Sequence, residues 1–119
     1  MMIKHVDANI ENVEFNSNDI VLLENCVVSN VKFNCATIIL VGRVSFTKCV
    51  FNYPQRADII AITSGTHVDF CKCVAAQRFN ILKGGDTIVH GQPRSDNMNV
   101  KIKCTKDHTI VLSDYYFQD

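Results

Sequence analysis

Cysteine and histidine are the residue types in this sequence that could carry chemistry, because their side chains act as nucleophiles, general bases or metal ligands. The chain has six cysteines, and its one close pair is Cys71 and Cys73. A single residue separates these two cysteines, whereas two residues separate the paired cysteines of a zinc knuckle, and no second Cys/His pair follows at a matching distance. On a strand the two side chains would point to the same face, so a metal site here remains an alternative.

Buried free thiols are the favoured interpretation of the cysteines, because a small apolar side chain suits a narrow core in a reducing compartment. Four of them are expected to close equivalent strands of successive repeats: Cys26, Cys49, Cys73 and Cys104.

The four histidines show no catalytic arrangement. His5, His67, His90 and His108 have no neighbouring serine or cysteine elbow and form no HExxH or GxSxG motif. The Gly84-Gly85 pair lacks the lysine and helix of a phosphate-binding loop, and the acidic residues are not paired for general acid–base work. We therefore expect no enzyme activity, no catalytic residue, no cofactor and no bound metal.

A repeated strand-and-turn unit organises the chain and is clearest in residues 37–57. An apolar run there ends at Gly42, and Val44-Ser45-Phe46 then alternates between apolar and polar side chains. Val68-Asp69-Phe70 repeats that triplet. Such alternation predicts strands with one buried face.

The same order of short motifs returns along the chain. Lys72-Cys73-Val74 repeats Lys48-Cys49-Val50, and further upstream Cys26-Val27-Val28 leads to Val31-Lys32-Phe33. The predicted unit starts are Asp19, Thr37, Asp58, Asp86 and His108, which are 18, 21, 28 and 22 residues apart.

A drifting period near twenty residues is typical of a β-solenoid, in which strands stack and turns accept insertions. The fold predicted is all-β, a right-handed parallel β-helix of about five to six short coils. The alternative is an antiparallel sandwich, whose strands also alternate and turn at short intervals.

Length and composition indicate a single domain over residues 1–119. With 47% hydrophobic residues, a chain of this length can bury roughly two-thirds of its unfolded surface. It has no apolar run near the ~20 residues of a membrane span, and its first residues lack the apolar block of a signal peptide. We expect a cytoplasmic protein that does not bind membranes.

The two ends are expected to differ from the middle. Residues 1–18 would form a capping coil, and residues 109–119 a terminal strand and tail that no later coil covers. An uncovered strand edge invites another chain, so we expect a homodimer that exchanges its last strands; the alternative is a tail folded over its own core. The predicted dimerisation residues are Thr109, Ile110, Val111, Leu112, Tyr115, Tyr116 and Phe117.

Charge is balanced overall but unevenly placed. Residues 71–106 carry seven basic side chains against two acidic ones, whereas acidic residues gather near the start of the chain. In a solenoid this arrangement separates a basic end from an acidic one. The default interpretation of such charge is a solvated face with no partner, and the alternative is docking to an acidic macromolecular surface. We do not expect nucleic acid as a partner, since the basic residues are not interleaved with exposed aromatic residues and the sequence has no base-reading motif.

Several short segments resemble the C-terminal β-helical domain of cyclase-associated proteins. These are Glu24 to Phe33, Asn80 to Lys83, Asp86 to Val89 and Ser95 to Ile102, with Phe117 near the end. The resemblance implies a dimeric β-helix that binds monomeric actin, associates with the cytoskeleton and promotes exchange of ADP for ATP on actin. The actin-binding residues it implies are Lys72, Arg94, Ser95, Asp96, Asn97, Met98 and Asn99.

Two other functions remain open. Val74 to Asn80 resembles the sister group, tubulin-folding cofactor C, whose domain stimulates GTP hydrolysis, but Asn80 stands where that group has its arginine. The domain would then contact a GTPase without activating it, unless Arg78 reaches the site. The third function is a structural β-solenoid that assembles with itself through its strand edges.

Overall fold

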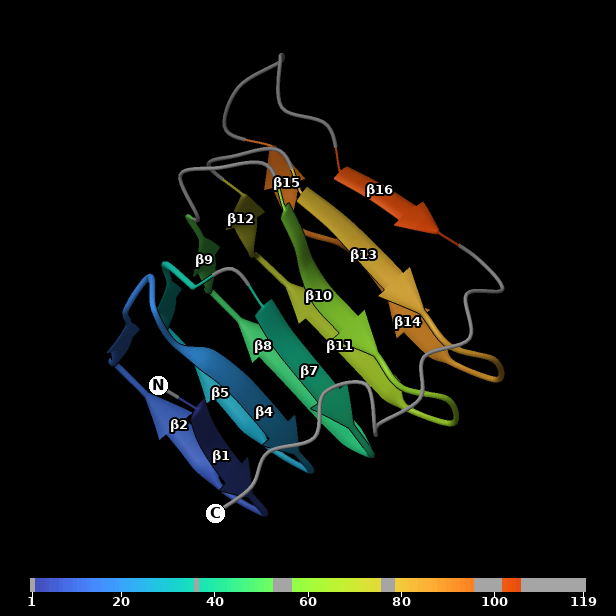
Figure 1. The fold of residues 1–119 in the computed structure, drawn as a ribbon, viewed down its shortest axis with the longest axis horizontal. Coiled ribbons are helices and arrows are strands. Elements are labelled where there is room, and N and C mark those ends of the chain that lie inside the picture. The colour runs from blue at the N-terminus through green and yellow to red at the C-terminus, as the bar shows by residue number, and fades with distance from the viewer. Residues whose placement is uncertain (1, 36, 53–56, 76–78, 96–101, 106–119) are drawn as a thin grey trace.

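The computed structural model describes residues 2–35, 37–52, 57–75, 79–95 and 102–105, and every element in it is a β-strand. All strand pairs are parallel and fall into three sheets, as expected for a β-solenoid (Figure 1). Sheet A contains β1 (Met2–Val6), β4 (Ile20–Glu24), β7 (Thr37–Val41), β10 (Ala57–Ile62), β13 (Phe79–Lys83) and β16 (Ile102–Thr105). Sheet B contains β2 (Asn9–Glu11), β5 (Val27–Ser29), β8 (Arg43–Thr47), β11 (His67–Cys71) and β14 (Ile88–His90). Sheet C contains β3 (Glu14–Phe15), β6 (Lys32–Phe33), β9 (Val50–Phe51), β12 (Val74–Ala75) and β15 (Arg94–Ser95).

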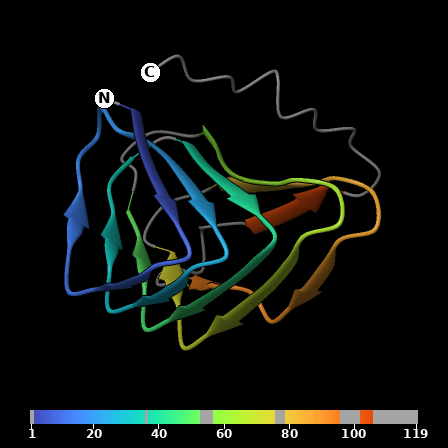
Figure 2. The ribbon, with the colours of Figure 1, turned by 90° about the horizontal axis from the view of Figure 1, so that it is seen from below.

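Each coil contributes one strand to each sheet in the order A, B, C. The described residues form five such coils and the first strand of a sixth, and Figure 2 shows the coils side by side along the stack. The predicted all-β parallel β-helix is thereby confirmed, and the antiparallel sandwich is wrong. Residues 2–15 supply one strand to every sheet, so the predicted capping coil is built like the coils that follow it.

Register confirms most of the sequence repeat and corrects one unit start. Val68, Asp69 and Phe70 pair with Val44, Ser45 and Phe46, and the units predicted from Asp19, Thr37 and Asp58 begin within one residue of β4, β7 and β10. The start predicted at Asp86 is wrong, because the fifth coil begins at Phe79 and Ile88–His90 is its second strand, paired with β11 in sheet B. The start predicted at His108 lies outside the described residues.

Stacked phenylalanines fill the core on the inner side of sheets B and C. Phe15, Phe33 and Phe51 occupy equivalent positions of successive coils, with ring centroids 5.3 and 5.2 Å apart and nearly parallel rings. Phe46 and Phe70 stack in the same way at 5.2 Å, and Phe46 meets Phe33 edge-on. Fully burying one such side chain contributes about 1.5–3 kcal/mol, so this ladder joins the coils into one core.

The middle strands of sheet A, β4, β7 and β10, are apolar on both faces. Val21 and Leu23 point into the main core, and Leu22 between them packs with Ile39 and Ala61 in a second cluster. Since successive residues of a strand alternate between faces, this second cluster lies on the outer face of sheet A, where Ile39 is fully buried. These middle strands of sheet A therefore have continuous apolar runs, whereas the strands of sheets B and C alternate. No helix in the described part of the chain is long and apolar enough to cross a membrane.

One left-handed residue in each coil turns the chain from sheet B to sheet C. Asn12, Asn30, Lys48, Lys72 and Gly91 hold this position with φ between 52° and 74°. Asparagine and glycine tolerate this conformation well, and here Asn30 Nδ2 also donates to Asn12 Oδ1 at 2.7 Å. The left-handed corner residues thus recur with the same period as the apolar strands.

The cysteines fill the insides of bends, with two departures from expectation. Cys26, Cys35, Cys49 and Cys73 are buried and free, as predicted. However, Cys71 is exposed at the end of β11, because the left-handed turn at Lys72 separates it from buried Cys73. The two thiols therefore share no face, contrary to the prediction from a straight strand.

The predicted equivalence of four cysteines holds for Cys49 and Cys73 alone. Both follow the left-handed residue of the turn between sheets B and C, and each Sγ lies 3.5 Å from the carbonyl two residues earlier. Cys26 makes a similar contact at the turn between sheets A and B, and Cys104 lies within β16. A small side chain with a weak donor fits any inside bend, so the residue type does not distinguish one corner from another.

Candidate binding surface

The outer face of sheet C carries one row of aligned side chains across five coils. Glu14, Lys32, Val50, Val74 and Arg94 are successive register partners. Because neighbouring strands lie about 4.8 Å apart, the three steps from Lys32 to Arg94 cover about 14 Å. Side chains far apart in sequence thus form a straight line along the stack.

Two further cations flank this row at the turn between sheets B and C. Lys48 and Lys72 hold the left-handed corner position in successive coils, and both side chains are exposed. Together with Lys32 and Arg94 they form what we call the basic edge. In the part of the chain that the structure describes, none of the four has an ion-pair partner within 4.0 Å.

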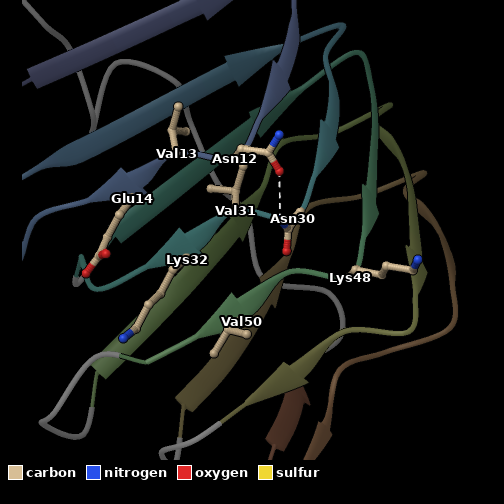
Figure 3. A pocket seen from close by; sticks show the side chains of 8 residues that line it. All are labelled: Asn12, Val13, Glu14, Asn30, Val31, Lys32, Lys48 and Val50. Carbon is tan, nitrogen blue, oxygen red and sulfur yellow. Dashed lines mark hydrogen bonds between the residues drawn. The ribbon is translucent and has the colours of Figure 1, made fainter.

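A shallow hollow of about 370 Å³ lies at the N-terminal end of the basic edge, beside Lys32 and Lys48 (Figure 3). Lys32 and Lys48 stand on its opposite sides, Val31 lies buried in its floor, and the Asn12–Asn30 hydrogen bond crosses it. Its lining residues are Asn12, Val13, Glu14, Asn30, Val31, Lys32, Lys48 and Val50. Amide and ammonium donors of this kind suit a carboxylate-bearing partner.

Glu14 gives the row an acidic end. Asn34 Nδ2 donates to Glu14 Oε1 at 2.7 Å, and Asn52 Nδ2 donates in turn to Asn34 Oδ1 at 3.3 Å. This amide ladder holds the carboxylate on the first coil. The sign of the surface therefore changes along the stack, from acidic at Glu14 to basic from Lys32 onward.

The structure brings together two of the residues predicted to bind actin. Lys72 and Arg94 are exposed on neighbouring coils, because Arg94 pairs with Val74, two residues after Lys72. Ser95 follows in β15, where its backbone pairs with Ala75. Asp96, Asn97, Met98 and Asn99 lie outside the described residues, as do Arg78 and all the predicted dimerisation residues from Thr109 to Phe117.

Lys32 and Lys48 are the members of the basic edge that the sequence analysis missed. A signal for Lys48 was present, since the repeat of Lys48-Cys49-Val50 in Lys72-Cys73-Val74 places the two lysines at one position of successive coils. Lys32 reaches the edge from the strand, so it needed the register of β6 against β9.

Comparison of the chain with protein-family models, with curated proteins and with solved structures gave no match. The function proposed below therefore depends on the residues and geometry of the chain itself.

Proposed function

We propose that this β-helix is a non-catalytic binding module that docks an acidic protein surface through its basic edge, and that its partner is monomeric actin. The observation that carries the proposal is the alignment of Lys32, Lys48, Lys72 and Arg94 from four successive coils along one side of the stack. Actin is the partner that the resemblance to cyclase-associated proteins implies, and promotion of ADP/ATP exchange is the activity it implies.

Differential binding is sufficient for that activity. A protein that binds actin more tightly when the nucleotide cleft is loosened shifts the population toward that state and speeds release of ADP, with no bond made or broken. A rigid stack of parallel strands suits this role, because the strands hold the backbone of the basic residues at fixed spacings and little backbone entropy is lost on binding.

The size of the electrostatic contribution follows from the exposure of the edge. An exposed ion pair contributes about 0.2–1 kcal/mol, so four pairs contribute about 1–4 kcal/mol. Reversing a charge replaces its attraction by a repulsion of similar size, so reversing two of them costs about 1–4 kcal/mol. Since 1.4 kcal/mol is about tenfold in Kd, the middle of this range, about 2.5 kcal/mol, corresponds to a loss of more than tenfold. The loss should shrink as salt rises, because added ions screen exposed charges.

The test is the rate at which fluorescent ADP leaves monomeric actin as the protein is titrated. We expect a saturating acceleration with the parent chain and a titration displaced more than tenfold with the double variant Lys72→Glu/Arg94→Glu. A matched control is Lys4→Glu/Lys83→Glu, which makes the same charge change on β1 and β13 of sheet A. Equal affinity of the edge variant and the parent would refute the docking surface.

Failure of the parent chain to bind actin would leave a different function to pursue. No described strand lies beyond β1, β2 and β3 of the first coil, and Met2, Val6 and Val13 there are 48%, 42% and 42% exposed. Such an open end is suited to stacking. Concentration-dependent polymers in sedimentation, without actin binding, would therefore support the structural self-assembling β-solenoid.

A further inference from the structure

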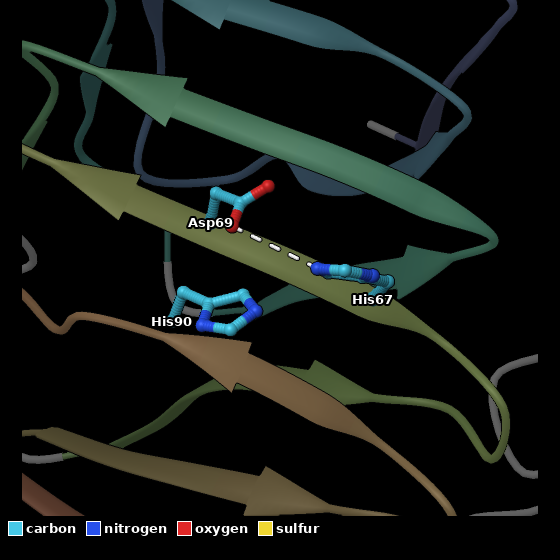
Figure 4. Close-up of side chains that lie close together, drawn as sticks. All are labelled: His67, Asp69 and His90. Atoms are coloured by element: carbon cyan, nitrogen blue, oxygen red, sulfur yellow. Dashed lines mark ion pairs between the residues drawn. The ribbon is translucent and has the colours of Figure 1, made fainter.

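His67, Asp69 and His90 converge on the outer face of sheet B. His67 and Asp69 are alternate residues of β11, so their side chains leave the strand on the same face. His90 lies in β14, the next strand of the sheet, and is the register partner of Asp69. Figure 4 shows the three side chains gathered over these two strands.

The distances within this cluster are close to those of a metal site. One ligand atom from each residue lies within 4.8 Å of the other two, and His67 Nε2 is 3.8 Å from Asp69 Oδ1. The two imidazole ring centroids are 5.1 Å apart. Tetrahedral coordination with bonds of about 2.1 Å places ligand atoms about 3.4 Å from each other, so small rotations of side chains at the surface would complete the geometry.

We propose that His67, Asp69 and His90 bind a divalent transition-metal ion, for which Zn²⁺ is the probe. Two imidazole nitrogens and one carboxylate oxygen form a ligand set that zinc and its neighbours prefer, whereas Ca²⁺ and Mg²⁺ prefer oxygen ligands alone. Three protein ligands leave a fourth position for water or for a group from another molecule. The carboxylate supplies one negative charge to balance the ion.

The surroundings leave the ion accessible. Ser45 is the partner of Asp69 on β8, Arg43 is the partner of His67 on β8, and Ile88 is the partner of His67 on β14. A hollow of about 440 Å³ adjoins Asp69 and is lined by Asn25, Cys26, Val27, Arg43, Ser45 and Asp69. Arg43 is the charged side chain next to the cluster on β8, and its positive charge lowers the affinity for a cation.

This site is distinct from the basic edge and does not depend on the proposed function. The cluster lies on sheet B, whereas the basic edge follows sheet C and the turn before it. No bound metal was expected from the sequence, because the Cys71/Cys73 pair lacks zinc-knuckle spacing and the histidines form no HExxH motif. Stacking of the coils brings together His67 and His90, which are 23 residues apart in the sequence.

The test is calorimetric titration of Zn²⁺ into the full chain after removal of metal, in a Cys71→Ser background. That background is needed because Cys71 is an exposed thiol on the same strand, and a thiolate is itself a zinc ligand. We expect one ion per chain with micromolar affinity, and a rise in Tm of about 10 °C at a free zinc concentration 100 times Kd.

Three variants and one control identify the ligands. His67→Gln, Asp69→Asn and His90→Gln should each weaken zinc binding at least tenfold and reduce the rise in Tm at the same zinc concentration to about half or less, while keeping the metal-free Tm and circular dichroism of the background protein. His5→Gln, on β1 of sheet A, should bind zinc as the background protein does. The proposal is overturned if the background protein takes up no zinc at 100 µM, if the three variants retain its affinity, or if His5→Gln loses affinity equally.

Discussion

Replacing Phe33 by alanine tests whether one continuous ring ladder holds the coils together. Phe33 is fully buried in the second coil and contacts Phe15, Phe46 and Phe51, at centroid distances of 5.3, 5.8 and 5.2 Å. Truncating a buried phenylalanine costs about 3–5 kcal/mol, and three ring partners place Phe33 near the upper end, at about 5 kcal/mol. A chain of this length has about 6–18 kcal/mol of stability, so the variant should still fold.

Phe15 is the matched comparison, because it lies at the end of the same ladder. It is 6% exposed, has Phe33 as its one ring partner among the phenylalanines whose side chains the structure describes, and meets His5 at a ring-centroid distance of 6.1 Å. We therefore expect Phe15→Ala to cost about 3 kcal/mol, and Phe33→Leu, which keeps most of the side-chain volume, less than about 2 kcal/mol.

The assay is urea unfolding followed by far-UV circular dichroism, with refolding from urea to establish reversibility. The free energy of unfolding should fall in the order parent, Phe33→Leu, Phe15→Ala, Phe33→Ala. If Phe33→Ala proves no more costly than Phe15→Ala, the rings do not act as a continuous core and the reasoning is refuted.

Two further predictions concern the corners of the solenoid. Lys48→Asn should raise the free energy of unfolding by about 0.5–1 kcal/mol, since asparagine tolerates the left-handed conformation at φ 54° better than lysine. The control Lys32→Asn, in the extended strand β6, should bring no gain in stability. Equal urea midpoints for the two variants would contradict this prediction. Burial raises the pKa of the Cys35 thiol from 9.0 to about 12. Above pH 9 the unfolded chain therefore loses this proton while the folded chain keeps it, so the free energy of unfolding should fall between pH 9 and about 12. Urea titrations at each pH should show a smaller fall in stability for Cys35→Ala than for the parent. Parallel pH profiles of the two proteins would argue against a buried thiol.

Two of the thiols inside the bends, Cys35 and Cys49, are expected to be unreactive. Cys49 has a raised pKa because its thiol takes part in a hydrogen bond with Cys73 and is buried. A thiol that stays protonated is a poor nucleophile. Cys35 and Cys49 are thus packing residues. The same hydrogen bond with Cys49 lowers the pKa of the Cys73 thiol, which lies buried in the core. Cys71 is the exposed cysteine among the described ones.

Strands and corners could be predicted because their signals are local. Alternation in Val44-Ser45-Phe46 and its repeat in Val68-Asp69-Phe70 identified equivalent strands that the structure pairs residue for residue. The fifth unit was misplaced because Asp86-Thr87-Ile88-Val89 has the polarity of a first strand, while the true first strand, Phe79–Lys83, lacks an acidic residue before it. Polarity alone does not tell one sheet of the solenoid from another.

The sequence by itself determined that this protein is a stack of short strands, because apolar alternation and the same order of short motifs return about every twenty positions. Only the tertiary structure decided which side chains of different coils meet. The turns between equivalent strands differ in length, so the register of one coil on the next depends on packing across the whole core. That register is what aligns Lys32, Lys48, Lys72 and Arg94 along one edge, and what places His90 beside Asp69.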